Sequence, residues 1–490
     1  MDHIRYLGAA TLIGVVFVSL AKMRRSKLPD NHPPIIHIPE SEIYNNPREA
    51  AYENALLEHG PIIAVRRKGI LEFIVREHLI QEIFTADQTF SFEHAQAKIL
   101  NLRPYVSAFW SFFKEIDDLV QSGINPRLGE IFEKSICPVF VRTAETAVQN
   151  KKIDMFEHAH TSIAEAMVVL ILGEDFVNER NIQVVADVAT DIAALTGIYS
   201  NSSTLARHFP KLWSVFIWIK VTSTTVLSFF RIIGPQIWRL LRSRRWNKGE
   251  ENPNTVLEYL AYRHASKADG KLAFPAFLWI MSLLLGIIFA SNSNQSASVV
   301  VWVIFELALR PEYLQVLREE IPADPLTHQL DASNIGDAIQ RAVWLDSFIR
   351  EVMRTKGDTL STCRLTTTDA KVAGYVIPKG HLVFPLATLV HMNPIHHPEP
   401  TVFRPERWHG ENARPAVMSS ASYIPFGIGR WACPGRVLAV SEIKMIVWSL
   451  IVKSTPRLEG NKYRVVDPLN ITAVPPEGDL VLEPYGTLSL

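Results

Sequence analysis

The chain contains 490 residues, of which 48% are hydrophobic and 20% charged, and its 50 basic and 50 acidic residues give a net charge of zero. This composition excludes an intrinsically disordered chain, and the balanced charge without a basic motif argues against a nucleic-acid-binding protein. The length is compatible with about two or three domains or with one large unit. The three cysteines, Cys137, Cys363 and Cys433, form no zinc-binding pattern, so we expect a reducing compartment without disulfides.

Residues 1–27 have the pattern of a membrane anchor. The segment Tyr6–Ala21 is apolar, and four basic residues follow it within 22–27. A spanning helix needs about 20 apolar residues, and basic residues favour the cytosolic side, so the rest of the chain is expected in the cytosol. A cleaved signal peptide is the alternative interpretation. The proline-rich residues 28–40 are predicted to be a hinge, and residues 41–490 to form one globular domain.

The first part of this domain alternates short strands with helices and then becomes mostly helical. We expect a helix near 47–59, strands at 61–67 and 71–77, and mainly helices from 81 to 320. The aromatic segment 212–246 predicts either a pair of core helices or a surface that dips into a membrane. Both alternatives remain open from the sequence.

A second long apolar run, from Leu272 to Phe289, is long enough to cross a membrane. Pro275 within it and the polar patch "SNSNQS" at 291–296 favour a buried core helix instead. A buried segment rarely carries so much polarity without a use for it, so the patch is a candidate functional site. Strands are expected again within 364–380, where Gly374 and the sequence "PKG" mark turns.

A glycine-rich loop near the C-terminus predicts a metal-binding thiolate. Residues 426–435 read "FGIGRWACPG" and place Phe426, Gly429, Cys433 and Gly435 in the pattern F-x-x-G-x-x-x-C-x-G. Glycines allow left-handed backbone and a close approach to a flat ligand. A helix starting at Pro434 would direct free N–H groups at the sulfur and stabilise a thiolate. The alternative is an inert cysteine in a glycine-rich turn.

Two further motifs precede this loop. Glu351 and Arg354 share a helix face as E-x-x-R, and residues 403–408 read "FRPERW", which contains Arg407. With the cysteine loop, in this order, they resemble the cytochrome P450 family of haem-thiolate monooxygenases, most of all its fungal membrane-bound members. The resemblance implies a mainly α fold with small β-sheets (α+β) and an N-terminal transmembrane helix.

The resemblance also assigns roles to residues. Cys433 is expected to bind the iron of haem b as its metal ligand, within the cofactor-binding loop that carries Phe426, Gly429 and Gly435. A buried charged triad of Glu351, Arg354 and Arg407 is expected to support the haem pocket. Arg430 is expected to bind a haem propionate, and Arg364 is a second candidate for this contact. Residues 356–363 and 472–480 are expected to line the substrate pocket.

The polar patch matches the family's oxygen-activating motif only in part. That motif has an acid followed by threonine, and here Ser293 and Asn294 occupy these positions, which makes them the candidate catalytic residues. Asparagine cannot titrate, although it can position water. Either Asn294 and water replace the usual pair, or the substrate supplies a hydroxyl or the reaction is unusual, or the register shifts and places Gln295 near oxygen. A second departure is Lys114 four residues after Trp110, where the family usually has arginine.

The resulting functional hypothesis is a monooxygenase that oxidises a lipophilic small molecule, such as a polyketide, terpenoid or alkaloid intermediate of fungal secondary metabolism. Because the chain has no flavin or dinucleotide motif, electrons are expected from NADPH through a partner, NADPH-cytochrome P450 reductase, with cytochrome b5 as a further partner. The expected location is the endoplasmic reticulum membrane, single-pass, with the catalytic domain in the cytosol. The alternatives are an atypical haem-thiolate enzyme that catalyses rearrangement, ring expansion or cyclisation, and a non-catalytic haem-binding protein.

Overall fold

The structure is a computed structural model of the whole chain. It describes residues 28–39, 42, 50–67, 70–99, 112–195, 209–246, 253–267, 269–291, 293–324, 330–358, 360, 362–467, 472 and 474–485. The predicted anchor at residues 1–27 therefore lies outside the described residues. Within the predicted hinge, the short strand β1 (Ile35–Ile36) pairs in parallel with β2 (Ile62–Arg67), so this part of the segment joins a sheet.

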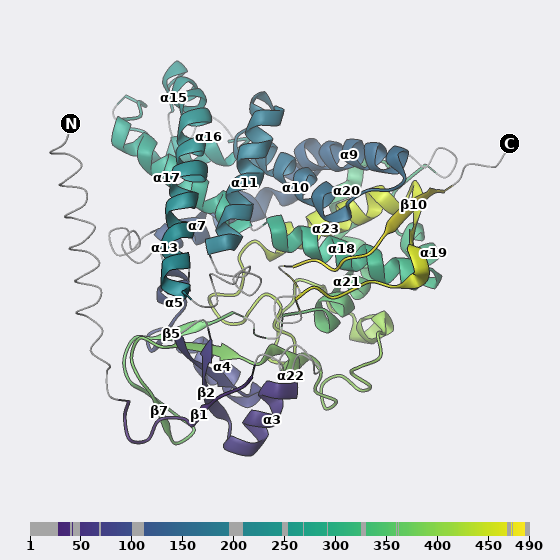
Figure 1. Cartoon of the computed structure of the whole chain (residues 1–490). Helices are drawn as coiled ribbons and strands as arrows, with labels where there is room; N and C mark the ends of the chain where they lie inside the picture. The colour runs from purple at the N-terminus through teal and green to yellow at the C-terminus, as the bar shows by residue number, and fades with distance from the viewer. Residues whose placement is uncertain are drawn as a thin grey trace.

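The largest sheet in the described part of the chain has six strands in the order β1-β2-β3-β8-β5-β4, and it lies at the lower left of Figure 1. The two predicted strands are β2 and β3 (Ile70–Val75), which pair antiparallel, and β8 (Leu382–Pro385) lies parallel to β3. The other strands are β4 (Phe90–Ser91), β5 (Arg364–Thr366), β6 (Ala370–Val372), β7 (Tyr375–Ile377), β9 (Ser454–Leu458) and β10 (Leu480–Pro484). The positive φ of Gly374 forms the predicted turn between β6 and β7.

Most of the helices lie in the upper and right-hand parts of the molecule, and others lie beside the six-stranded sheet at the bottom (Figure 1). They are α3 (Ala50–His59), α4 (Ile80–Thr85), α5 (Phe92–Ile99), α7 (Phe112–Leu119), α8 (Leu128–Ile131), α9 (Cys137–Asn150), α10 (Met155–Ile171), α11 (Glu179–Leu195), α13 (Pro210–Val221), α14 (Leu227–Ile232), α15 (Gly234–Ser243), α16 (Val256–His264), α17 (Phe274–Ser291), α18 (Ser293–Leu309), α19 (Glu312–Glu319), α20 (Ile335–Arg341), α21 (Val343–Thr355), α22 (Ala387–His391) and α23 (Arg436–Ile451). The prediction of a mainly α fold with small β-sheets is confirmed.

Local sequence explains where two of the core helices begin. The carboxylate of Asp154 caps α10 by accepting a hydrogen bond from the backbone N–H of Glu157. The hydroxyl of Thr255 caps α16 in the same way through the N–H of Glu258. Each cap satisfies an N–H that has no partner within the helix, which stabilises a helix start by about 1 kcal/mol.

The helices α17 and α18 run through the centre of the domain. Within the described residues, two helical stretches are long and apolar enough to cross a membrane, Val215–Ser243 and Phe274–Leu309. The second one contributes Ile280, Leu284 and Ile288 to the main hydrophobic core, and α18 packs against α10, α21 and α23. The stretch Phe274–Leu309 thus contributes to the core as predicted, although Phe274 and Leu278 are exposed, and the polar patch lies within this stretch.

The aromatic segment 212–246 divides into two parts with different surroundings. In α13 the apolar side chains of Leu212, Phe216 and Ile219 are more than half exposed, and they follow each other at helical spacing. In α14 and α15 the side chains of Phe229 and Ile237 are buried in the main core. The core-helix alternative therefore describes α14 and α15, whereas α13 has an exposed apolar face for which the membrane alternative stays open.

Candidate functional site: the thiol-lined cavity

The loop that carries Cys433 is held by its own backbone. The N–H of Cys433 donates to the carbonyl of Phe426 at 2.8 Å, which closes the loop. Gly429 has a φ of 73°, and a Cβ there would lie 3.2 Å from the carbonyl oxygen of Phe84. Both the left-handed backbone and this close approach require glycine. The loop is therefore closed at Cys433 and packs against helix α4 at Gly429.

Helix α23 begins at Arg436, with Gly435 as its N-cap, and not at Pro434 as the sequence predicts. Gly435 has a φ of −84°, so the left-handed backbone expected for the loop glycines does not occur at this position. The N–H groups at the start of α23 nevertheless point at the sulfur of Cys433. Burial raises the pKa of the Cys433 thiol, while the N–H groups of Gly435 and Arg436 and the charge of Arg436 act to lower it. These donors favour the thiolate, and a metal ion bound to the sulfur would complete its deprotonation.

Cys433 lies in the wall of a cavity of about 870 Å³, which is within the range of small-molecule sites. The wall is mostly apolar and aromatic and includes Phe112, Phe113 and Trp279. Phe426 and Gly435 of the cysteine loop also line it, whereas Gly429 does not. The thiol of Cys433 and a mostly apolar surface thus line the same cavity.

The polar patch faces the same cavity. Ala290, Ser291, Asn294 and Gln295 all line it. Asn294 is 1% exposed, and its Nδ2 donates to the carbonyl oxygen of Ala189 in α11 at 3.2 Å. The backbone of Ser293 starts α18, but its side chain lies outside the described residues. Since Asn294 and Gln295 both reach the cavity, the register alternative stays open.

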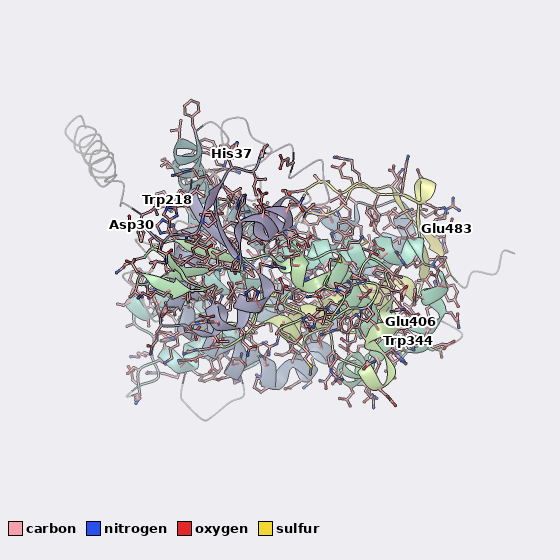
Figure 2. All side chains as sticks on the ribbon, turned by 90° about the horizontal axis from the view of Figure 1, so that it is seen from below. Asp30, His37, Trp218, Trp344, Glu406 and Glu483 are labelled. Carbon is pink, nitrogen blue, oxygen red and sulfur yellow. The ribbon has the colours of Figure 1, made fainter. Side chains whose placement is uncertain are left out.

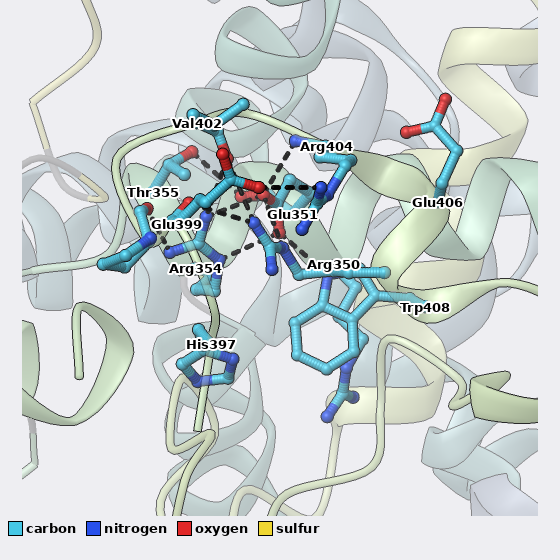
Figure 3. Close-up of polar contacts among 12 residues, drawn as sticks. Arg350, Glu351, Arg354, Thr355, His397, Glu399, Val402, Arg404, Glu406 and Trp408 are labelled. Atoms are coloured by element: carbon cyan, nitrogen blue, oxygen red, sulfur yellow. Dashed lines mark hydrogen bonds and ion pairs between the residues drawn. The ribbon is translucent and has the colours of Figure 1, made fainter. Parts of the chain in front are cut away.

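The predicted triad is assembled around the carboxylate of Glu351. Figure 3 shows the network that contains Glu351 and Arg354. Glu351 accepts a bidentate pair of hydrogen bonds from Arg354 at 2.7 and 2.9 Å and one from Nε of Arg407 at 3.1 Å. The backbone N–H of Arg404 and Nε1 of Trp408, both at 2.9 Å, complete its shell. Burial alone would raise the pKa of Glu351, but these partners outweigh it and hold the pKa below its ordinary value. The carboxylate is therefore charged and fully satisfied.

Neither predicted propionate ligand lines the cavity directly. Arg364 is completely buried behind Phe92, which does line it, and its guanidinium carbon lies 4.7 Å from the ring centroid of Phe84. Among the described residues no carboxylate pairs with Arg364, and its Nε has no hydrogen-bond partner. Burial lowers its pKa to about 10, so it stays charged at neutral pH. Arg364 donates to the carbonyls of Cys363 and Phe84 and lies in the field of Asp87. A buried guanidinium with an unpartnered Nε fits a cofactor that brings its own carboxylate.

Arg430 is exposed and lies 5.1 Å from the ring centroid of Trp431. Its charge opposes the burial that raises the pKa values of Glu93 and Asp117, so these two acids lie near it. Trp110 is outside the described residues, and Lys114 is exposed. Within the described chain, no group of three or more His, Cys, Asp or Glu residues could hold a metal ion.

The two segments predicted to flank the substrate pocket are joined to each other. Both Asp358 and Thr472 line the cavity, and Asp358 accepts from the N–H of Thr472 at 2.8 Å and from its hydroxyl at 2.6 Å. Sequence reasoning missed most of the other lining residues, including the acid Glu442 of α23. The only sequence signal for it is an acid within an otherwise apolar helix.

The fold and the cysteine loop define a haem-thiolate type of protein, and comparison with known proteins supports this class. Residues 112–477 match the family model that is described as Cytochrome P450. The chain therefore belongs to the cytochrome P450 family, whose members bind haem through a cysteine thiolate. The structure is similar to the retinoic acid-bound cyanobacterial CYP120A1, with a TM-score of 0.67 over 94% of this chain and 100% of that one, at 18% identity. At that identity the likeness shows the fold alone.

Curated relatives come from fungi and plants. The chain is 31% identical to cytochrome P450 monooxygenase 151 of Postia placenta over 50% of this chain and 49% of the relative. It is 32% identical to cytochrome P450 monooxygenase gliF of Aspergillus fumigatus over 47% and 49%. It is also 32% identical to beta-amyrin 11-oxidase of Glycyrrhiza uralensis over 34% and 33%. These matches span between a third and a half of each relative's length.

Proposed function

We propose that the cavity binds haem b, with the Cys433 sulfur as the protein ligand of the iron. The N–H groups of Gly435 and Arg436 would tune the thiolate, and Arg364 and Arg430 would bind the propionates. The bound haem would supply activation of dioxygen, which a thiolate ligand favours. The supporting observations are a thiol at the wall of a large cavity and a buried arginine, Arg364, whose Nε has no hydrogen-bond partner.

The reaction that fits this site best is monooxygenation of a lipophilic small molecule with O2 and electrons from NADPH. One observation carries this proposal: the thiol of Cys433 and the polar patch around Asn294 line a single, otherwise apolar cavity. The apolar wall would bind the substrate and exclude water. The polar side chains would hold and move protons on the opposite side from the thiolate.

The lining suggests the substrate class. Aromatic side chains such as Phe112 and Trp279 suit a fused-ring or polyene skeleton, and the joined pair of Asp358 and Thr472 offers hydrogen bonds to its polar groups. One relative is named an oxidase of beta-amyrin, and the similar solved structure carries retinoic acid. The proposal is an intermediate of fungal secondary metabolism, that is, a polyketide, a terpenoid or an alkaloid.

We place the enzyme at the endoplasmic reticulum membrane, held by residues 1–27 as a single-pass anchor, with residues 41–490 as the cytosolic catalytic domain. The exposed apolar face of α13 supports membrane contact as well. In Figure 2, Trp218 of α13 lies towards the same edge of the molecule as Asp30, whereas Trp344 and Glu406 lie towards the opposite edge. NADPH-cytochrome P450 reductase would donate electrons, with cytochrome b5 as a second donor.

One observation favours a second candidate function. Asn294 donates an amide N–H to the carbonyl of Ala189, and its amide cannot supply a proton for the reaction. An atypical reaction that consumes no NADPH, such as a rearrangement, ring expansion or cyclisation, would not need that proton. A non-catalytic haem-binding protein would not need it either.

The test is to incubate the full-length protein and its reductase in membranes with the candidate intermediate, NADPH and isotopically labelled dioxygen. A monooxygenase yields a product with one labelled oxygen atom and consumes one NADPH per product. An isomeric product without NADPH consumption supports the rearranging enzyme. A change in the haem spectrum without any product supports the binding protein. The Cys433→Ser variant is the control and should form no product.

A further inference from the structure

The peptide group that follows Cys433 receives a hydrogen bond from a distant part of the chain. The side-chain Nδ2 of Asn125 donates to the carbonyl oxygen of Pro434 at 3.3 Å, across 309 positions of sequence. Asn125 begins the short 3₁₀ helix Asn125–Arg127, and the residue before it, Ile124, lines the cavity. The cysteine loop is therefore held by the segment that follows α7 as well as by its own backbone.

The other half of the Asn125 amide shows how the side chain is oriented. Its Oδ1 is buried and has no hydrogen-bond partner among the described residues. Turning the amide over would place Oδ1 against the carbonyl oxygen of Pro434, and two acceptors would then face each other. A buried amide that leaves its acceptor unpaired costs free energy, so the residue needs an explanation other than stability.

The peptide group that Asn125 binds is the one that faces the sulfur. The carbonyl of Pro434 and the N–H of Gly435 belong to the same planar amide. The N–H groups of Gly435 and Arg436 act on the sulfur of Cys433. Asn125 is therefore separated from the sulfur by a single peptide group, with one hydrogen bond at each end of it.

A hydrogen bond at one end of a peptide group strengthens the bond at the other end. The donor on the carbonyl oxygen draws electron density from the amide, so the N–H of Gly435 becomes a better donor. The neighbouring peptide cannot act in this way. Its carbonyl, that of Cys433, accepts from Nη1 of Arg436 at 2.7 Å, but Pro434 has no N–H to pass the effect on.

We propose that Asn125 is a positioning residue of the thiolate ligand, which acts on the sulfur of Cys433 through the peptide between Pro434 and Gly435. The inference rests on the proposed binding of haem by Cys433. A better N–H donor keeps electron density on the sulfur, so less of it reaches the iron. Oxidised haem depends more on this density than reduced haem does, and Asn125 therefore raises the reduction potential.

The experiment compares the full-length haem-loaded wild type with Asn125→Leu, Asn125→Ala and the control Asn150→Ala. Leucine keeps most of the volume of asparagine and removes the donor, and alanine is the second variant in case leucine does not fit. Asn150 is the matched control because it is an exposed asparagine at the end of α9 and does not line the cavity.

The first measurement is a redox titration of the haem. At a fixed potential, both Asn125 variants should lower the ratio of reduced to oxidised haem by about 2- to 10-fold, the equivalent of one hydrogen bond. Asn150→Ala should leave this ratio unchanged. A merely structural role of Asn125 would lower the stability of the protein without moving the titration curve.

The second measurement is the infrared stretching frequency of carbon monoxide bound to the reduced haem. A thiolate with a weaker hydrogen bond pushes more electron density through the iron into carbon monoxide and weakens its bond. Both Asn125 variants should therefore lower this frequency, and Asn150→Ala should not.

If the redox curve or the carbon monoxide frequency is unchanged in both Asn125 variants, the inference is overturned, while haem binding by Cys433 stands. A wild type that lacks the red-shifted Soret band of a thiolate-bound haem would overturn the proposed haem binding, and the inference with it.

Discussion

Glu351 and Arg354 form a bidentate ion pair at 2.7 and 2.9 Å in which both side chains are completely buried. The pair is satisfied from all sides, because Arg407 and Trp408 bind the same carboxylate and Arg354 also donates to the carbonyls of His391 and Pro400. It joins α21 to the segment that follows α22, directly before the cysteine loop. We infer that this network fixes the floor of the cavity.

Replacing one partner should leave a buried charge without compensation. Glu351→Gln should lower the free energy of unfolding by about 3–5 kcal/mol, because Arg354 and Arg407 remain buried without an anion. Urea denaturation followed by circular dichroism measures this change. The control is Glu477→Gln, since Glu477 pairs with Arg464 on the exposed surface, where such a pair contributes less than about 1 kcal/mol. Equal stability of the two variants would contradict the role of the network.

The same carboxylate gives stability a defined dependence on acid. The pKa of Glu351 is lower in the folded protein than its ordinary value of 4.5. Its contribution is therefore present above that value and is lost as the pH falls through the lower, folded-state pKa. Thermal unfolding of the wild type should show a loss of stability below about pH 4 that is smaller in Glu351→Gln. An identical pH profile for both would contradict the assignment.

Glu442 should make the stability of the protein depend on pH in the opposite direction. Its pKa rises from 4.5 to about 8, so the folded protein holds a proton that the unfolded chain releases. Stability from this group is complete below about pH 4.5 and falls as the pH rises toward 8, by at most about 1.4 kcal/mol per pH unit. Glu442→Gln should remove this slope. Chemical denaturation at several pH values within this window measures it, and a slope that persists in the variant would refute the assignment.

Gly286 allows α17 to approach α7. A Cβ at this position would lie 2.5 Å from Cζ of Phe112 and 2.7 Å from Cδ1 of Ile116. Gly286→Ala should therefore destabilise the protein by about 1–3 kcal/mol and displace Phe112, which lines the cavity. Denaturation and substrate-binding titrations measure both effects. Gly129→Ala in α8 is the control, because a Cβ there meets nothing within 4 Å, and it should be neutral or stabilising.

Asn294 connects α18 to α11 through the carbonyl of Ala189. Asn294→Ala should lower stability by about 1 kcal/mol, the usual contribution of one hydrogen bond. Because the amide itself gives no proton, the variant should keep most of its product formed per NADPH. A loss of product of about 10²-fold would instead make Asn294 the central residue of the polar patch.

Periodic patterns made much of the fold predictable. The strands β2 and β3 and the buried helices α17 and α18 follow from alternating or continuous apolar residues, and the cysteine loop follows from its glycines. The start of α23 differs from the prediction because Gly435, not Cys433, takes the N-cap position. Sequence patterns describe local structure, and this boundary is set by the hydrogen bonds that close the loop.

Long-range contacts were not predictable in the same way. The bond from Asn294 to Ala189 joins residues far apart in the chain, and so do the bonds from Arg404 and Trp408 to Glu351. The buried, unpaired state of Glu442 depends on the neutral surfaces that the fold places around it. An acid in an apolar helix could equally have been paired. Lys444, which lies on the same helix as Glu442, is paired with Asp346 of α21.

The bond between the Cys433 sulfur and haem iron is the central claim, and the spectrum of the reduced protein with carbon monoxide tests it most directly. The wild type and the control Cys137→Ala should show the red-shifted Soret band of a thiolate-bound haem, because Cys137 is buried in α9 away from the cavity. Cys433→Ser should lose this band. A wild type without the band, or a Cys433→Ser variant that retains it, would contradict the account.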